Sequence, residues 1–216
     1  MQDITDFDKD KYHFFIGNIF NNENQIRLLK NIQKKLIKKY KLKNYHWNNK
    51  YCSNLLYLGY LNQNTAAKYM DNIIVHLLKA LSDKFNNLEC EYTGYKIEYD
   101  KSFYKISLKI NDTNNYLENI IVPYLHQNAI LPIYEKRKNI LKPSIDLVYY
   151  KDSSKISSKK NDIKIMIPTE KFIIDHISLI RGNSIKVRSG TPSLHNQMNL
   201  EEIHKYSIPL KGSLNN

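Results

Sequence analysis

The chain has 216 residues, of which 42% are hydrophobic and 12% aromatic, enough for one sizeable core and too apolar for a wholly disordered chain. A formal net charge of +12 favours polyanionic partners, RNA before acidic membrane surfaces. No apolar run reaches the roughly 18–20 residues that span a bilayer. The acidic start lacks a signal-peptide core, which predicts an intracellular protein, cytoplasmic or organellar rather than secreted.

Two strand-helix units are predicted in the first part of the chain. Residues 11–20 are rich in aromatic and β-branched side chains, a composition typical of a buried strand. Residues 24–40 place apolar side chains at helical spacing, with lysines on the opposite face. The short apolar run 55–61 predicts a second strand, and Thr65 is the expected N-cap of a second amphipathic helix.

Strand patterns dominate the rest of the chain, where one helix is predicted over 116–130 and Pro123 bends or delays it. The predicted strands cover 90–95, 103–110, 145–150, 171–180 and 206–210. Polar composition predicts mobile loops over 151–162 and 182–200. This order predicts an α+β fold, a single domain over 1–216 with a core of about 11–210, in which two similar sheet halves flanked by helices surround a central cleft.

Short matching segments follow one another in the order and spacing of a known fold. They are the strand 12–17, Trp47, Leu55-Leu56-Tyr57-Leu58-Gly59, the glycine-containing strand 92–95, the segment 141–147 and Tyr206-Ser207-Ile208-Pro209-Leu210. In this order the chain resembles the LigT-like 2H phosphoesterases, RNA 2′,3′-cyclic phosphodiesterases related to 2′-5′ RNA ligases. The resemblance implies a bilobal fold with a catalytic cleft between the halves.

The resemblance also implies two H-x-[ST] motifs, one from each half, whose imidazoles act as general base and general acid on a cyclic phosphate. In this chain Cys52 and Asn54 stand at the first motif, and Ser144 and Asp146 at the second. Neither Cys52 nor Ser144 exchanges protons near neutral pH as histidine does, and the carboxylate of Asp146 repels a phosphate. We therefore expect a catalytically inactive protein that needs no cofactor and no metal.

One literal motif leaves an alternative open. His176 and Ser178 form an H-x-S sequence, although they lie on the strand that follows the expected second motif. The alternative function is a divergent RNA 2′,3′-cyclic phosphodiesterase that uses His176 and Ser178. His46, beside Trp47, is a further candidate to supply the missing imidazole if the register there slips.

Basic runs and aromatic residues indicate where RNA would bind, although each basic run is also what a solvated helix face or loop looks like. The leading expectation is an inactive LigT-like domain that serves as an RNA-binding or ribonucleoprotein-assembly module. A subunit of a larger ribonucleoprotein is a related possibility. The predicted RNA-binding residues are Lys34, Lys35, Lys38, Lys39, Lys136, Arg137, Lys138, Tyr149 and Tyr150.

Overall fold

The computed structural model describes residues 11–48, 50–100, 103–128, 142–153, 163–187 and 195–211. The helical elements are α1 (Glu23–Tyr40), α2 (Gln63–Tyr69), α3 (Val75–Lys84) and α4 (Val122–Asn128), with π-helical segments η1 (Met70–Ile74) and η2 (Leu117–Ile121). The strands are β1 (Lys11–Ile19), β2 (Leu42–Lys43), β3 (Cys52–Asn62), β4 (Leu88–Asp100), β5 (Phe103–Asp112), β6 (Ser144–Tyr150), β7 (Asp152–Ser153), β8 (Phe172–Ile174), β9 (His176–Val187) and β10 (His195–Pro209).

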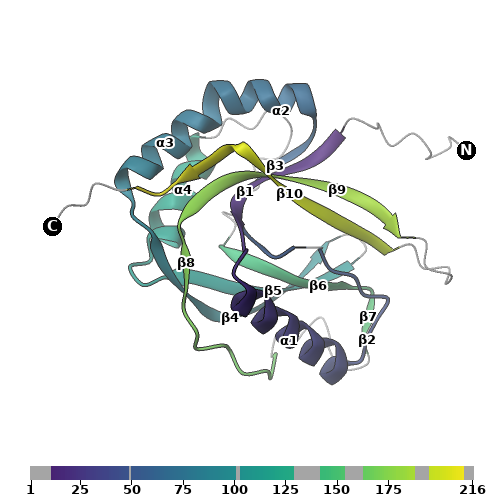
Figure 1. The fold of residues 1–216 in the computed structure, drawn as a ribbon. Helices are drawn as coiled ribbons and strands as arrows, with labels where there is room; N and C mark the ends of the chain where they lie inside the picture. The colour runs from purple at the N-terminus through teal and green to yellow at the C-terminus, as the bar shows by residue number, and fades with distance from the viewer. Residues whose placement is uncertain are drawn as a thin grey trace, which may run out of the picture.

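Eight of the strands form one curled antiparallel sheet in the order β10-β9-β1-β3-β6-β5-β4-β8, and β2 pairs with β7 separately (Figure 1). The sheet consists of two groups of four strands joined by the β3–β6 pairing. That pairing is short, with Ser53 opposite Ile145 and Asn54 opposite Ser144. The structure therefore confirms the predicted α+β architecture with two sheet halves.

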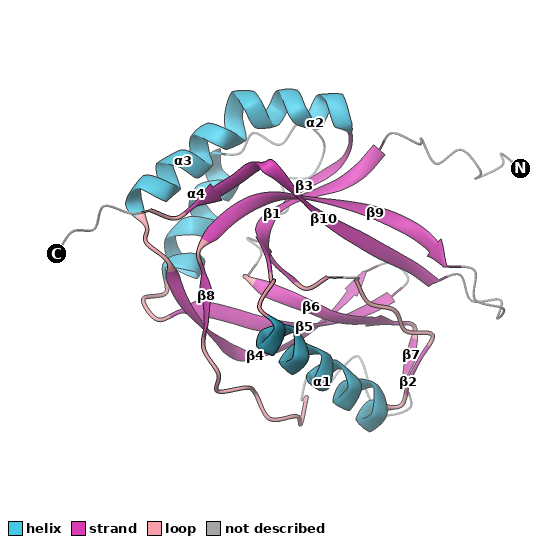
Figure 2. Cartoon of the chain, in the orientation of Figure 1, coloured by secondary structure: helices cyan, strands magenta, loops and turns pink. Residues whose placement is uncertain are grey.

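The helices contact different halves of this sheet (Figure 2). α1 packs on β6, where the Gln33 amide donates to the carbonyl of Leu147 at 2.7 Å. The helices α2, α3 and α4 instead contact strands of the first half, namely β1, β3 and β10. Each helix buries the apolar stripe that its periodicity predicts, as Leu29, Ile32 and Leu36 do in α1.

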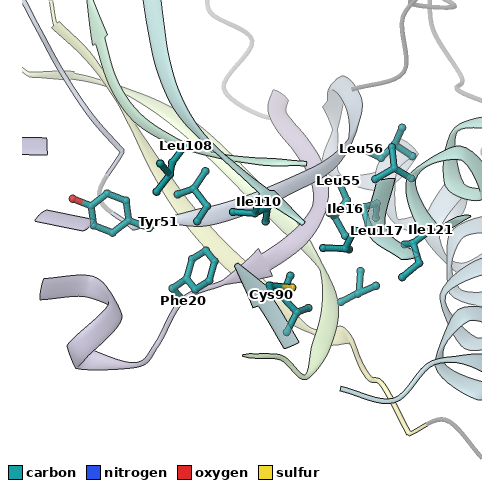
Figure 3. Close-up of a cluster of buried hydrophobic side chains, with 14 of the residues drawn as sticks. Ile16, Phe20, Tyr51, Leu55, Leu56, Cys90, Leu108, Ile110, Leu117 and Ile121 are labelled. Atoms are coloured by element: carbon teal, nitrogen blue, oxygen red, sulfur yellow. The ribbon is translucent and has the colours of Figure 1, made fainter. Parts of the chain in front are cut away.

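One hydrophobic core connects the two halves (Figure 3). It joins Ile16 and Leu55, from β1 and β3, with Leu108 and Ile110 of β5. Because this core is continuous, the two halves hold each other in place although the β3–β6 hydrogen bonding is short.

The prediction of a loop over 182–200 is wrong for residues 182–187 and 195–200, while residues 188–194 lie outside the described part of the chain. β9 continues to Val187 and β10 begins at His195, and the two strands pair in antiparallel register from His195 to Glu202 and again from Ser207 to Pro209. The segment carries few apolar side chains because β10 lies at the edge of the sheet. Backbone hydrogen bonding to β9 therefore forms the strand without the hydrophobic alternation that sequence reasoning looks for. Most of the other predicted loop, over 151–162, lies outside the described residues.

The expected strand over 171–180 is divided at Asp175 into two. β8 pairs with β4 in the second half, whereas β9 pairs with β1 in the first, so this segment crosses between the halves.

The prediction of Thr65 as the N-cap of the second helix is wrong. Asn62 is the N-cap of α2, and its side chain accepts from the Thr65 backbone N–H at 2.7 Å. Pro123 lies inside a continuous helical stretch, because the π-helical segment η2 (Leu117–Ile121) runs directly into α4.

Candidate functional site

The two halves of the sheet meet at the motif-equivalent positions. Asn54 on β3 lies opposite Ser144 on β6, and its side-chain amide donates to Asp146 Oδ2 at 3.1 Å. The thiol of Cys52 in turn donates to Asn54 Oδ1 at 3.3 Å. The structure therefore places Cys52, Asn54, Ser144 and Asp146 together, as the alignment to two H-x-[ST] motifs predicts.

The carboxylate of Asp146 is surrounded by donors. Besides Asn54, the hydroxyls of Ser107 and Tyr149 each donate to it at 2.8 Å. The ammonium of Lys105 lies 3.4 Å from Asp146 Oδ1. Asp146 is only 8% exposed, so its negative charge is balanced inside the protein rather than by solvent. We call these five side chains, together with Cys52, the Asp146 network.

The other titratable groups of this network hold their protons near neutral pH. Burial raises the pKa of the Cys52 thiol, and the charge of Asp146 raises it further. Burial and Asp146 likewise raise the pKa of Tyr149 well above its ordinary value. Burial lowers the pKa of Lys105, but the carboxylates of Asp146 and Glu98 outweigh that effect and raise it overall. None of these three groups can therefore act as a general base.

Residues that sequence reasoning missed complete this network. Lys105 and Ser107 lie on β5, whose register places Ser107 opposite Asp146 and Lys105 opposite Tyr149. The sequence does indicate a polar face on this strand, because Lys105, Ser107 and Lys109 alternate with apolar residues. The sequence did not show that this polar row lies beside the second motif.

His176 and Ser178 belong to a second polar cluster, on β9 and β10. The imidazole Nδ1 lies 2.5 Å from a carboxylate oxygen of Asp175, and Nε2 lies 3.3 Å from Glu202. The Ser178 hydroxyl donates to Glu202 at 2.5 Å and to Ser207 at 3.0 Å. Ser178 is fully buried, while His176 lines a cavity of about 620 Å³ at the start of α1. We call these five side chains the His176 cluster.

Two carboxylates therefore flank His176. Burial raises the pKa of Glu202, but hydrogen bonds from Ser178 and Ser207 and the positive charge of His176 outweigh it and lower that pKa overall. Glu202 is consequently ionised at neutral pH. A phosphate that approached His176 would meet the negative charges of Glu202 and Asp175.

Strand β1 lies between the two clusters. Gly17 pairs with Asn54 on one side and with Ser178 on the other. Next to it, the Asn18 backbone N–H donates to Ser53 at 3.1 Å, and the Asn18 side-chain amide contacts the His176 ring at 3.1 Å. The clusters are thus neighbours across one strand, with separate sets of hydrogen bonds.

The predicted RNA-binding lysines of α1 are all exposed: Lys34, Lys35, Lys38 and Lys39. Lys35, Lys38 and Lys39 line a groove of about 730 Å³ together with Lys164, and its apolar part includes Ile32 and Met166. This groove combines positive charge with apolar surface on the side of α1 that faces residues 163–170.

The two tyrosines predicted to contact RNA are less exposed than the lysines of α1. Tyr149 is half-buried, and its ring stacks on His46 with centroids 4.9 Å apart and planes 6° from parallel. Tyr150 is 1% exposed and packs on Tyr104, so its ring is not available to stack on a base. The predicted contacts Lys136, Arg137 and Lys138 lie outside the described residues.

No family model matches the chain, and no curated protein sequence matches it. Solved structures do match, over 93% of this chain. TT0787 of Thermus thermophilus is 13% identical, with a TM-score of 0.60 over 99% of its length. Escherichia coli LigT complexed with 3′-AMP is 10% identical, with a TM-score of 0.58 over 98% of its length. The chain therefore has the LigT-like fold of the 2H phosphoesterases.

Two further features bear on partners. Within the part of the chain that the structure describes, none of the helices is long and apolar enough to cross a membrane. Over the same residues, no three His, Cys, Asp or Glu side chains are grouped so that they could hold a metal ion.

Proposed function

We propose that this chain is a catalytically inactive LigT-like protein that acts as an RNA-binding or ribonucleoprotein-assembly module. The observation that carries the proposal is the Asp146 network. Cys52, a protonated thiol, and Ser144, a hydroxyl, stand where the fold's phosphodiesterases are expected to carry two imidazoles, and the carboxylate of Asp146 stands where the second motif is expected to carry a Ser or Thr hydroxyl.

Inactivity follows from the chemistry of these groups. In-line opening of a cyclic phosphate needs one group to accept a proton and another to donate one near neutral pH. The Cys52 thiol does neither, and the donors that would stabilise a phosphate, Asn54 and Ser107, are already bound to Asp146. The negative charge of Asp146 further opposes an incoming phosphate.

RNA binding is supported by charge and by the fold. The exposed lysines of α1 supply a positive surface, and the net charge of +12 provides long-range attraction for a polyanion. A solved structure of the LigT fold contains 3′-AMP, a nucleotide bound to that protein. For this chain, we infer that nucleic acid is bound through phosphate contacts of the α1 lysines.

A salt titration tests the α1 surface. The double substitution Lys35→Gln/Lys38→Gln should weaken binding of a single-stranded RNA and reduce the slope of log affinity against log salt by about 0.7 per lysine. Lys68→Gln/Lys79→Gln removes equal charge from exposed positions on α2 and α3 and is the matched control. Equal slopes for both pairs would contradict a role for the α1 surface.

An activity assay tests the loss of catalysis. Purified protein incubated with a nucleoside 2′,3′-cyclic phosphate should produce no phosphomonoester above the blank. Co-purification then separates the two forms of the proposal, since a ribonucleoprotein subunit migrates with a large particle whereas a free RNA-binding module does not.

The alternative function is a divergent RNA 2′,3′-cyclic phosphodiesterase that uses His176 and Ser178. One observation favours it: His176 borders a cavity of about 620 Å³ and is held by Asp175, as an orienting carboxylate holds a catalytic imidazole. Hydrolysis that is lost in His176→Ala and retained in Asp146→Asn would establish this alternative and overturn the inactive assignment.

A further inference from the structure

The groove beside α1 combines positive charge with an apolar wall in one place. One side consists of α1, which contributes the exposed side chains of Lys35, Lys38 and Lys39. The other side consists of residues 163–170, which lie alongside α1 and add a fourth lysine (Figure 1). Among the described residues that line the groove, Glu170 is the one with a carboxylate, so four positive charges face one negative charge. We call this space of about 730 Å³ the α1 groove.

The lysines of the α1 groove are available to a negatively charged ligand. Lys38 and Lys39 lie three and four residues after Lys35, so the three side chains project from one face of the helix. Within the described part of the chain, Lys35 and Lys38 form no ion pair. Their ammonium groups therefore lack a carboxylate that an incoming phosphate would have to displace.

Hydrogen bonds hold the segment opposite α1 in place. The backbone N–H of Lys164 donates to the Tyr40 hydroxyl at 2.7 Å. The ammonium of Lys39 donates to the carbonyl of Lys164. The Tyr95 hydroxyl donates to the carbonyl of Met166 at 3.3 Å. The segment therefore has a defined position along the groove although it forms neither a helix nor a strand.

Apolar side chains of the same segment face this row of charge. Ile165, Met166 and Pro168 line the groove, and they lie across it from Leu28 and Ile32 of α1. The side chain of Met166 is 85% exposed, the largest value among the exposed large hydrophobic residues that the structure describes. Contacts to phosphates require charge but no apolar wall. The α1 groove therefore fits a ligand that carries apolar surface as well as negative charge.

We propose that the α1 groove binds single-stranded RNA, with phosphates on its lysines and an unpaired base against the side chain of Met166. The proposal rests on the RNA-binding function proposed above and specifies its ligand. The bases of a single strand can be splayed out and offer their faces to a protein, whereas the bases of a duplex are stacked and paired. The thioether of methionine makes favourable contacts with aromatic rings and adapts to rings of different shape.

The size of the groove favours nucleotides over an acidic amphipathic peptide, which would also combine negative charge with apolar side chains. A peptide helix is about 10–12 Å across with its side chains. Sites for small ligands have volumes of about 300–1,000 Å³, and the α1 groove, at about 730 Å³, lies within that range. The groove therefore suits a ligand that enters as single nucleotide units.

The test compares Met166→Gln with Ile120→Gln in the full chain. Ile120 is a matched control, because it is an exposed apolar residue on η2 that does not line the groove. The labelled probes, followed by fluorescence anisotropy, are a single-stranded oligouridine, an abasic strand and an RNA duplex of equal length. Met166→Gln should weaken oligouridine binding about 4- to 15-fold, which corresponds to the lost contact of about one or two methylene groups. Binding of the abasic strand and of the duplex should not change, and Ile120→Gln should bind all three probes normally.

Two further variants separate base contacts from phosphate contacts. Met166→Leu should bind oligouridine normally because it keeps the apolar wall. The salt slope should be unchanged in Met166→Gln, whereas Lys164→Gln should reduce it by about 0.7 because a phosphate contact is lost. Normal oligouridine binding by Met166→Gln, or an equal loss for oligouridine and the abasic strand, would overturn the inference. So would a peptide of alternating glutamate and leucine that displaces labelled oligouridine at a lower concentration than unlabelled oligouridine does, since it would assign the groove to a protein.

The outcome also distinguishes this proposal from the one on which it rests. A chain that binds none of the probes contradicts the RNA-binding function itself. A chain that binds oligouridine through the α1 lysines, with Met166→Gln and Ile120→Gln both unaffected, leaves the function standing and overturns only the contact between a base and Met166.

Discussion

The Asp146 network and the His176 cluster place a carboxylate beside a serine hydroxyl in similar ways, yet their electrostatics differ. Asp146 accepts from Ser107 at 2.8 Å and is balanced by Lys105. Glu202 accepts from Ser178 at 2.5 Å, and its neighbour is the His176 imidazole, which the carboxylate of Asp175 also contacts. The two regions therefore differ in the charge around the serine: a lysine lies beside the carboxylate of the Asp146 network, whereas two carboxylates, Glu202 and Asp175, lie beside the imidazole of the His176 cluster.

Gly17 pairs with a strand of each region, and its replacement should lower the unfolding free energy more than the other substitutions proposed below. A Cβ atom at this position would lie 1.9 Å from the carbonyl oxygen of Ser53, which is backbone and cannot move aside alone. Gly17→Ala should therefore push β1 away from β3 and cost about 3 kcal/mol of unfolding free energy. Urea denaturation measures this.

A substitution at another glycine is the control for Gly17→Ala. A Cβ at Gly94 meets nothing within 4 Å, although the φ of +153° carries backbone strain, so Gly94→Ala should cost less. If the two alanine variants unfold at the same urea concentration, the close approach of β1 to β3 is not what holds the two regions in register.

Removing the charge of Asp146 should destabilise the Asp146 network and leave the His176 cluster unchanged. Asp146→Asn keeps the shape of the side chain but leaves Lys105 without its buried partner and turns an amide toward Asn54. We expect a loss of about 2 kcal/mol, measured by urea denaturation.

A double variant sharpens the Asp146 experiment. Asp146→Asn leaves Lys105 with Glu98, 3.1 Å away, in place of two carboxylates, so Lys105→Met/Asp146→Asn should recover part of the lost stability by removing the weakly balanced cation. Equal or greater stability of Asp146→Asn alone would show that Lys105 does not depend on this carboxylate.

The smallest expected change in stability comes from Glu202 in the His176 cluster, and it depends on pH. The pKa of Glu202 is lowered in the folded chain, so Glu202 contributes stability above its ordinary value of 4.5, and this contribution is lost as the pH falls through the folded value. The unsubstituted chain should thus be more stable than Glu202→Gln at neutral pH, and the difference should shrink in acid.

Thermal unfolding at a series of pH values measures this difference. Glu201→Gln is the control, because the side chain of Glu201 is 57% exposed beside Arg181. A difference between Glu202→Gln and the unsubstituted chain that stays constant from neutral to acid pH would contradict the assignment of an ionised Glu202 in the cluster.

The apolar runs 55–61 and 145–150 predicted the two strands, whereas the meeting of the two motif positions was predicted by the resemblance to the LigT-like family. The sequence could not show Lys105 and Ser107 beside Asp146, since the register of β5 against β6 depends on pairing between separate segments. The sequence also did not show the register shift of β3 against β1 between Phe14 and Phe15, because a glycine such as Gly59 within an apolar run can indicate a bulge but does not say how the partner strand is aligned.

The strand order has a consequence for synthesis on the ribosome. β1 and β3 emerge early, but their half of the sheet is completed by β9 and β10, which are among the last strands made. Until then the edge of β1 exposes unpaired backbone donors and acceptors, while β4, β5 and β6 can already pair locally. The nascent chain therefore has an unpaired strand edge at β1 until β9 has been synthesised.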